Sequence, residues 1–409
     1  MTSGVESPPL PAGRIALLGE TGLDQVSPGS VGAKAYNLFR MADAGIPVPP
    51  LFVLGTATGR ELGRPRGLRR EDLAGLVRAG VHHLERATRL GFGAGRHPLL
   101  LAVRSGAAVS MPGMLETLLD VGLDDTTLPG LLRATGDPVF VWDSYRRLVQ
   151  TYAEVVDDLP PGPFAAVVEA ACAREGVASA SELDADATRH VVHELRERYR
   201  DAARRDFPQD PMEQLLGAVG AVLRSWDSPR AATYRRLQGL GDLTGTAVTV
   251  QAMVFGNLGV TSGAGVGFSR DPATGRDELY VDFLLDAQGE DVVAGRQRAG
   301  DADAALAAVP GLRHRLRSTA RTLEGLFGDA QDFEFTVQEG VLWLLQSRSA
   351  KRTPWAALQI ACDLVDEGLL PPAVARQRLA GYDLEAIVRV RLDPAAAASA
   401  VPVAEATPA

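Results

Sequence analysis

The sequence predicts an α+β protein whose strands are largely segregated from its helices. Helical spacing of apolar residues dominates the first part of the chain, whereas strand patterns follow one another from Gly245 onward. This change of period is typical of α+β folds and differs from the regular strand–helix alternation that builds a parallel sheet. With 409 residues, the chain is long enough for two or three hydrophobic cores.

The composition is that of an ordinary globular protein, and it narrows the class of partner. Hydrophobic residues make up 46% of the chain, and the net charge of −9 argues against non-specific nucleic-acid binding. No apolar run is long enough to cross a bilayer, and residues 1–11 lack the order of a signal peptide. Cys172 and Cys362 have no C-x-x-C partner, which predicts buried free thiols. We therefore expect a cytoplasmic enzyme without a membrane or nucleic-acid partner.

Capping residues and helical spacing locate the main helices. A helix over 33–44 ends at Gly45, because the prolines of the following Ile-Pro-Val-Pro-Pro segment cannot continue it. Asp210, Pro211 and Glu213 are the N-cap, N1 and N3 residues of a well-started helix. Further helices are predicted over 71–89, 139–156, within 162–205 and over 354–367.

Strand patterns and the helices together divide the chain into segments. Strands are predicted over 246–255, 265–269, 278–285, 332–337 and 341–346. We expect a first subdomain over 13–118 that continues in 206–244, a helical insertion over 119–205, a β-rich subdomain over 245–350, C-terminal helices over 351–393, and disordered tails over 1–12 and 394–409.

Two cations lie where the chain could bind phosphate. The apolar run 99–103 predicts a buried strand that ends in Arg104 and opens into a loop of small residues, where backbone N–H groups can approach an anion. Lys34 lies in the first turn of its helix, where a bound anion would offset the unfavourable helix dipole. An ordinary turn and a solvated lysine are the alternatives. Lys34 and Lys351 are the only lysines in an arginine-rich chain, which favours a specific role for Lys34.

A glycine-rich segment and an acidic hairpin are the other candidate sites. Residues 256–265 are rich in Gly, Ser and Thr and could fold over a polyphosphate, although they could also form a plain connection. Asp332 and Glu334 lie on one strand face, and carboxylate and amide oxygens suit Mg²⁺. A solvated hairpin with paired charges is the alternative, but Leu342, Leu344 and Gln346 would share a face in it, which is an unusual mixture.

The register of this hairpin decides whether a shared metal site exists. A two-residue connection would pair Glu334 with Leu345 and send Gln346 to the opposite face. We predict a three-residue connection, 339–341, which pairs Glu334 with Gln346 and Asp332 with Arg348. The four side chains would then converge on one cleft together with Lys34 and Arg104.

The histidines are predicted to lie on the solvated surface. None of them sits in a small-residue loop that opens a helix, where a phosphate-accepting imidazole is expected. They are His82, His83, His97, His190, His193 and His314.

Several long motifs together identify a family. They are Ser105–Gly113, Trp142–Arg147, Ser225–Ala231, Met253–Asn257, Ala287–Gly295 and Leu345–Arg348. Over about residues 17–389 the chain resembles the N-terminal nucleotide-binding domain of pyruvate, phosphate dikinase, an ATP-grasp domain also called the PEP/pyruvate-binding domain. The resemblance implies an ATP-grasp fold with a helical insertion and a cleft for Mg-ATP between the mixed and the β-rich segments.

The resemblance also implies roles for individual residues, with ATP and Mg²⁺ as cofactors. It gives catalytic roles to Arg104, which contacts the phosphates with Lys34, and to Arg348, which lies near the terminal phosphates. The other implied contacts are Gln251, Met253 and Val254 beside the adenine, Thr261, Ser262, Gly263 and Gly265 over the polyphosphate, and Asp332, Glu334 and Gln346 on magnesium, with Asp282 as a further metal candidate.

Departures from the family pattern concern the pocket and the acceptor. The paired glycine before the lysine is Gly32-Ala33 here, and the glutamate before the Ala-Gln-Gly-Glu-Asp motif is Asp282. No histidine matches the phosphate-acceptor motif of the family's swivelling domain, and no cysteine matches the acid of its barrel, so we expect that the complete dikinase reaction cannot run on this chain alone.

Three functions are compatible with these features. The first is an ATP-dependent phosphotransferase component that phosphorylates a histidine on a separate protein. The second is a kinase that acts on a small molecule, since the fold does not dictate the acceptor. The third is a non-catalytic nucleotide-binding regulatory module, which the full magnesium set disfavours.

Overall fold

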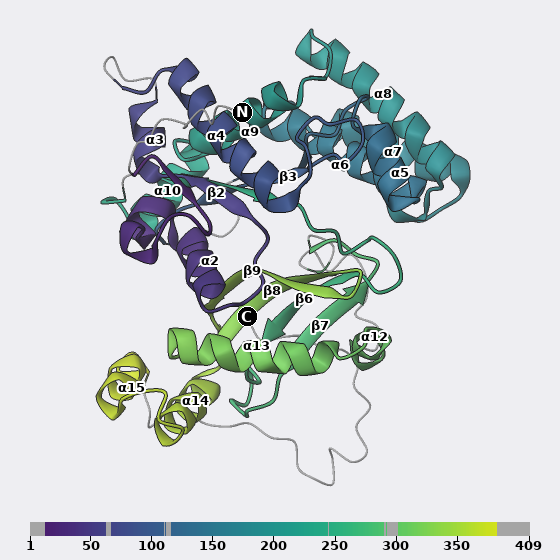
Figure 1. Cartoon of the computed structure of the whole chain (residues 1–409). Helices are drawn as coiled ribbons and strands as arrows, with labels where there is room; N and C mark the ends of the chain where they lie inside the picture. Colours follow the sequence, from purple (N-terminus) through teal and green to yellow (C-terminus); the bar gives the residue numbers. More distant parts are fainter. Residues whose placement is uncertain are drawn as a thin grey trace, which may run out of the picture. The chain divides into compact units, whose positions relative to one another are not determined.

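The computed structural model describes residues 13–62, 67–109, 111, 116–243, 245–289, 292 and 302–382. Within these ranges the chain forms two compact units (Figure 1). Unit 1 holds the described residues up to Phe39 together with Pro49–Met253, and unit 2 holds Arg40–Val48 and the described residues from Val254 onward. The predicted tails 1–12 and 394–409, and parts of the motifs 105–113 and 287–295, lie outside the described residues.

Unit 1 is built on a five-stranded sheet with the strand order β1-β2-β5-β3-β4, in which every neighbouring pair is antiparallel. This arrangement agrees with the prediction of segregated strands rather than a parallel sheet. The strands are β1 (Ile15–Leu17), β2 (Leu51–Leu54), β5 (Ala247–Ala252), β3 (Leu101–Gly106) and β4 (Thr117–Val121).

Two long helices pack on this sheet. In α4 (Arg70–Thr88), Gly80 lies so close to the ring of Phe52 that a Cβ there would be 2.5 Å from it. In α9 (Pro211–Ser225), Asp210 caps the first turn through Met212 N, as the sequence predicts. Shorter helices precede and follow them, namely η1 (Leu23–Gln25), α1 (Pro28–Val31), α3 (Thr56–Glu61) and α10 (Pro229–Leu237). The helix α2 (Ala33–Asp43) begins in unit 1, and its residues from Arg40 onward belong to unit 2.

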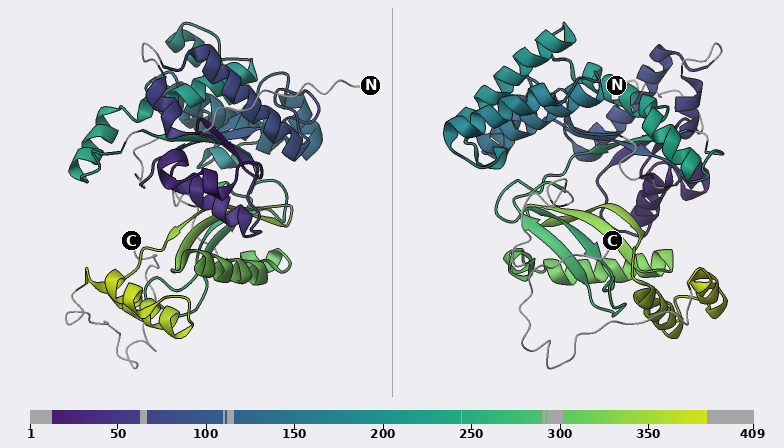
Figure 2. Two further views of the ribbon diagram at one scale, coloured as in Figure 1. Left: turned by 60° about the vertical axis from the view of Figure 1, so that its left-hand side comes forward. Right: turned by 180° about the vertical axis from the view of Figure 1, so that it is seen from behind.

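The predicted helical insertion is a group of helices within unit 1. Its core is aromatic: the rings of Tyr152 and Tyr199 each lie 5.4 Å from the ring of Phe207, edge to face. Figure 2 shows α6 and α8 side by side in both views. The helices are α5 (Leu128–Thr135), α6 (Pro138–Val155), α7 (Gly162–Glu175), η2 (Ala180–Glu182) and α8 (Ala185–Ala203).

Unit 2 is built on a four-stranded antiparallel sheet with the order β7-β6-β8-β9. The helix α13 (Leu312–Phe327) lies along one face of the sheet (Figures 1 and 2) and buries Leu312, Leu316 and Leu323. The other elements are β6 (Gly263–Phe268), β7 (Tyr280–Leu285), α12 (Ala302–Ala308), β8 (Gln331–Gln338), β9 (Val341–Ser349), α14 (Pro354–Asp366) and α15 (Pro372–Leu379).

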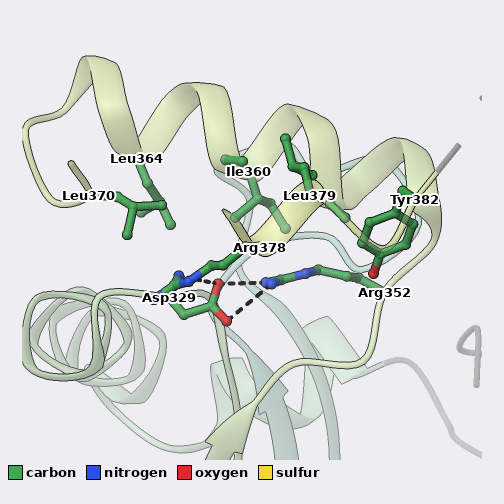
Figure 3. A pocket seen from close by; sticks show the side chains of 10 residues that line it. Asp329, Arg352, Ile360, Leu364, Leu370, Arg378, Leu379 and Tyr382 are labelled. Carbon is green, nitrogen blue, oxygen red and sulfur yellow. Dashed lines mark hydrogen bonds and ion pairs between the residues drawn. The ribbon is translucent and has the colours of Figure 1, made fainter. Parts of the chain in front are cut away.

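Salt bridges connect Asp329, just before β8, to Arg352, just before α14, and to Arg378 on α15. Asp329 accepts hydrogen bonds from Arg352 at 2.7 and 3.1 Å, and Arg378 lies 3.4 Å from the same carboxylate (Figure 3). A cavity of about 250 Å³ lies beside these charges, and its other walls are mainly the apolar residues Ala357, Ile360, Ala361, Leu364, Leu370 and Leu379. None of the predicted site residues lines this cavity.

The structure moves two predicted boundaries. The one between residues 118 and 119 falls inside β4, which belongs to the first sheet. We placed the start of the β-rich subdomain at residue 245, but β5 pairs with β2 and β3 in the centre of the first sheet. The chain therefore passes from unit 1 to unit 2 between Met253 and Val254. The spacing of apolar residues changes from helical to strand-like at β5, and the chain leaves the first sheet only after this strand. Periodicity alone therefore could not place this boundary.

Two surface predictions were wrong. His83 is 5% exposed, because its face of α4 packs inward, and its Nδ1 lies 3.0 Å from Glu20 Oε1. The other five histidines are exposed. Both cysteines are free and lie in helices, as predicted, but Cys362 is exposed and Cys172 only half-buried. Among the described residues, no helix combines the length and the apolar character needed to cross a membrane.

Candidate functional site

The sheet of unit 1 carries Arg104 on the same face as two buried polar residues. Arg104 on β3 pairs with Thr249 on β5, and Ala102 pairs with Gln251. Because side chains alternate along a strand, Arg104, Thr249 and Gln251 point to one face. Thr249 is 4% exposed and Gln251 is 1% exposed. This face of the sheet therefore combines a cation with polar groups, which suits an anionic ligand with polar parts.

Lys34 is held close to the end of the Arg104 strand by backbone contacts. Gly32 has φ +83°, and a Cβ at this position would lie 2.4 Å from the carbonyl oxygen of Gly106, the last residue of β3. The next residue, Ala33, donates its N–H to Ala107 O at 2.9 Å. Since Lys34 is exposed in the first turn of α2, its helix begins against the segment that follows Arg104. Only glycine fits at position 32, which explains why this glycine precedes the lysine.

The residues predicted to lie beside adenine are at the exit from unit 1. Gln251 donates its side-chain amide to Pro49 O at 3.2 Å, and Met253 donates its N–H to Leu100 O at 2.9 Å. Met253 and Val254 are half-buried and stand on either side of the boundary between the units. The end of β5 is thus anchored to two neighbouring segments of unit 1 before the chain enters unit 2.

The hairpin of β8 and β9 has the predicted pairing. Glu334 pairs with Gln346, and Asp332 pairs with Arg348. The alternation of side chains along β8 puts Asp332 and Glu334 on one face, and their partners on β9 share that face. The prediction that these four residues come together within the hairpin is therefore confirmed.

The structural cause of this pairing differs from the predicted one. The connection is two residues long, Glu339 and Gly340, with φ +48° and +78°, and Gln338 pairs with Val341. A shift of register between Glu334 and Phe335 then leaves Leu345 as an extra residue on β9. This β-bulge restores the pairing that a two-residue turn alone would have lost.

The bulge also corrects the predicted mixture of side chains on β9. Leu342 pairs with Val337 and Leu344 pairs with Phe335, so both leucines lie on the face opposite to Gln346. Without the bulge, even-numbered residues would have stayed on one face throughout the strand. Leu342 and Leu344 therefore lie with Phe335 and Val337, on the face opposite to the two carboxylates.

Short contacts connect the polar side chains across the hairpin. Arg348 donates its Nε–H to Asp332 Oδ2 at 2.6 Å, and Gln346 donates its amide to Glu334 Oε1 at 3.3 Å. Asp332 is 4% exposed. Burial raises the pKa of Asp332, Arg348 lowers it, Glu334 raises it, and the net result is a raised pKa. An additional cation near these carboxylates would favour their charged forms.

Asp282 lies in the same row of the sheet but two strands away from Glu334. Val266 on β6 pairs with Asp282 on one side and with Glu334 on the other. Neighbouring strands are about 4.8 Å apart, so the two acidic residues are about 10 Å apart at their backbones. The row continues to Gln346 on β9. Asp282 therefore shares the face of the metal candidates without adjoining them.

The last three residues of the predicted glycine-rich segment are part of β6. Gly263 and Gly265 lie in this strand, which pairs with β7 and β8 on its two sides. A Cβ on Gly265 would lie 2.6 Å from the ring of Phe335, and one on Gly263 would lie 2.4 Å from the ring of Phe283. Close packing against aromatic rings thus accounts for these two glycines. Their predicted contact with phosphate stays a prediction.

The connection itself comprises the residues before β6. Thr261 is half-buried, whereas Ser262 is fully buried and its hydroxyl donates to Leu258 O and accepts from Glu339 N. Gly259 and Val260 are exposed, with Val260 at 88%. The segment that can reach a ligand is therefore shorter than predicted and centred on 258–261.

Comparison with known proteins decides the family. The sequence pattern of the family described as "Pyruvate phosphate dikinase, AMP/ATP-binding domain" matches residues 72–302, which is more than half of the chain. The chain belongs to this family. Its fold is accordingly of the ATP-grasp type, and ATP and Mg²⁺, as predicted, are the cofactors of the family.

Curated pyruvate, phosphate dikinases are similar along most of this chain. The enzyme from Clostridium symbiosum is 40% identical over 380 residues, which is 93% of this chain and 44% of that protein. The enzyme from Rhizobium meliloti (strain 1021) is 43% identical over 381 residues, 89% of this chain and 42% of that protein. Pyruvate, phosphate dikinase 2 of Zea mays is 45% identical over 345 residues, covering 83% and 38%. The chain thus spans less than half the length of these relatives.

The polar face of the hairpin fits the magnesium expected in this dikinase domain family. Two carboxylates and one amide oxygen are hard ligands, and the pairing of the strands puts them on one face of the hairpin. Among the described residues, no three acidic, histidine or cysteine side chains are grouped as a complete metal site. Mg²⁺ in nucleotide sites binds through one or two carboxylates and completes its shell with water and phosphate oxygens.

Proposed function

We propose that this chain binds Mg-ATP and serves as a phosphotransferase component that phosphorylates a histidine on a separate protein. The observation that carries the proposal is the pairing of Asp332 and Glu334 with Arg348 and Gln346 on one face of the β8–β9 hairpin. Membership of the dikinase AMP/ATP-binding family supports ATP as the donor. The activity of the longer relatives, their acceptors and their partners enter here as part of the proposal.

The proposal gives each candidate residue a role toward one part of Mg-ATP. Lys34 and Arg104 bind the phosphates, and Arg104 and Arg348 stabilise the charge of the group in transfer. Magnesium, when bound, neutralises charge on the phosphate oxygens. Asp332, Glu334 and Gln346 hold it, and Asp282 can contact its water shell. Gln251, Met253 and Val254 contact the adenine. Thr261 and Ser262 at the end of the covering loop, with Gly263 and Gly265 at the start of β6, lie beside the polyphosphate.

The positions of the histidines support an acceptor outside these residues. All six lie within the described residues, on α4, α8, α13 or the connection before β3. None of them is on the face of β3 that carries Arg104 or on β8 and β9. A histidine outside the described residues therefore fits the role of acceptor better than one of these six.

Transfer to a histidine can be measured directly. The purified chain would be incubated with ATP labelled in the β or the γ phosphate and with candidate phosphohistidine-domain proteins, followed by detection of acid-labile label on the acceptor. We expect label on at least one acceptor, and the nucleotide product, AMP or ADP, identifies which phosphoryl group moves. ATP binding without transfer to any acceptor would contradict the proposal, and ATP consumption with a metabolite alone would indicate a small-molecule kinase.

The phosphate contacts predict a specific loss of affinity. Lys34→Ala and Arg104→Ala should each weaken ATP binding, because a charge-assisted contact is worth roughly 1.5–3 kcal/mol, or about ten- to a hundredfold in Kd. Arg78→Ala, an exposed cation on α4, is the matched control and should leave the affinity unchanged. Isothermal titration with ATP measures all three. Wild-type affinity in both test variants would place the phosphates elsewhere.

A further inference from the structure

The segment between β5 and β6 is attached to the turn of the β8–β9 hairpin at both of its ends. At its start, Phe255 donates its N–H to Gln338 Oε1 at 2.8 Å. At its end, Ser262 Oγ accepts the N–H of Glu339 at 2.8 Å, and Thr261 O accepts the N–H of Gly340 at 3.1 Å. Between these attachments the tip of the segment is exposed, with Val260 at 88%.

These contacts use amides that a tight turn leaves without ladder partners. Glu339 and Gly340 form the two-residue connection, and both have positive φ values. Their N–H groups are therefore available outside the hairpin ladder, and exposed turns satisfy such groups with water. Here both donate to the glycine-rich segment instead. The turn thus provides an attachment for the loop in addition to connecting two strands.

The turn and the loop are each held from a second side. Arg315 of α13 donates to Gly340 O at 2.7 Å, which fixes the turn to the helix. Within the loop, the hydroxyl of Ser262 donates to Leu258 O. Ser262 Oγ therefore donates its one proton to backbone and accepts a backbone N–H, inside a residue that is 0% exposed. Such a hydroxyl holds backbone in place rather than contacting a ligand.

Gln338 connects this attachment to the metal candidates. It lies on the same strand as Asp332 and Glu334, an even number of residues away, and therefore points to the same face of β8. A rise of about 3.3 Å per residue puts it about 13 Å along the strand from Glu334. One strand therefore carries both the magnesium candidates and the side chain that holds the start of the loop.

We propose that the β8–β9 turn positions the glycine-rich loop for ATP, and that Gln338 and Ser262 are the positioning residues. The proposal rests on the proposed function for its nucleotide. It replaces the predicted direct contact of Ser262 with phosphate by an indirect one, and it adds Gln338, which the sequence analysis did not single out. The hydrogen bonds to the turn keep the loop in place relative to Glu334. From there its backbone N–H groups would contact the phosphates.

Three variants test the attachment through Gln338. Gln338→Met keeps the length of the side chain but removes the acceptor for Phe255 N–H, whereas Gln338→Glu keeps an acceptor oxygen. Gln377→Met, at an exposed position of α15, is the matched control. Hydrogen exchange of peptides spanning 255–262 reports on the loop without any nucleotide. We expect faster exchange in Gln338→Met, near-wild-type exchange in Gln338→Glu, and no change in the control.

ATP titration of the same variants tests the role in binding. Loss of one neutral hydrogen bond corresponds to about a two- to tenfold rise in Kd for ATP in Gln338→Met, with rescue by Gln338→Glu. Unchanged exchange in Gln338→Met would overturn the attachment. Faster exchange with wild-type ATP affinity would overturn the role in positioning. If the wild-type chain bound no ATP, the proposed function and this role would both fail, while the exchange data would still decide the attachment.

Discussion

Arg270 is expected to be the most sensitive charged residue for the stability of unit 2. It follows β6, is 1% exposed on its side chain and donates to Glu324 on α13 at 2.9 and 3.0 Å. A further hydrogen bond of 2.6 Å connects it to Glu367, after α14. Burial alone lowers the pKa of Arg270, but its bonds to Glu324 and Glu367 raise it above the ordinary value, so the guanidinium stays charged.

The cost of removing this residue follows from what it leaves behind. Glu324 is 5% exposed on its side chain and would lose its guanidinium partner in Arg270→Met. Removing one partner of a buried ion pair costs about 3–5 kcal/mol, and each kcal/mol lowers the Tm of a unit of this size by about 2–4 °C. We therefore expect Arg270→Met to lower the Tm by about 6–20 °C in differential scanning calorimetry.

Two further variants separate this cause from a general loss of packing. Arg276→Met removes an exposed pair with Glu278 at 3.9 Å and should change stability by less than about 0.5 kcal/mol. Adding Glu324→Leu to Arg270→Met removes the stranded charge and should recover part of the lost Tm. A Tm for Arg270→Met equal to that of Arg276→Met would refute the reasoning, and so would a double variant less stable than Arg270→Met.

Two other predictions concern the metal and pH. Removal of magnesium with EDTA, or the substitution Glu334→Gln, should abolish phosphoryl transfer. Some ATP should still bind, because adenine contacts do not need the metal. Full turnover in Glu334→Gln would exclude this residue as a ligand. Burial raises the pKa of Asp143, but Arg146 and Arg147 outweigh it and hold that pKa below its ordinary value. Its contribution to stability is therefore present above about pH 4 and is lost as the pH falls through the lower folded-state pKa. Urea unfolding should show a stability gap between wild type and Asp143→Asn at pH 7 that shrinks towards pH 3, and a gap that widens would contradict this sign.

Much of the fold follows from local signals in the sequence. The predicted helix over 33–44 corresponds to α2, which ends at Asp43 just before the chain reaches Gly45. The pattern over 332–337 corresponds to β8 within one residue at each end. Apolar period and capping residues fix such elements locally, so no knowledge of their neighbours is needed. The pairing of β5 with β2 and β3 is different, because it joins residues about 150–200 positions apart along the chain.

The burial of single polar residues was harder to predict for the same reason. Ser262 lies in a segment whose composition indicates a ligand-binding loop, and its hydroxyl is nevertheless used by Leu258 and by the distant Glu339. His83 follows the exposed His82 on the amphipathic helix α4, yet it turns inward to Glu20. Composition reports what a segment can do, whereas the partner of a particular atom depends on tertiary packing.

The hairpin shows how a correct pairing can arise from an unpredicted cause. Two requirements conflict in it: the two-residue turn Glu339-Gly340 pairs Gln338 with Val341, while a shared polar face needs Glu334 opposite Gln346. A regular hairpin cannot satisfy both, since a one-residue slip exchanges the faces. The extra residue Leu345 resolves the conflict four pairs beyond the turn. In the sequence, the bulge is visible as the mixture of Leu342, Leu344 and Gln346 at alternate positions. In a strand with one buried apolar face, alternate residues can change from apolar to polar only where an extra residue moves the following side chains to the other face.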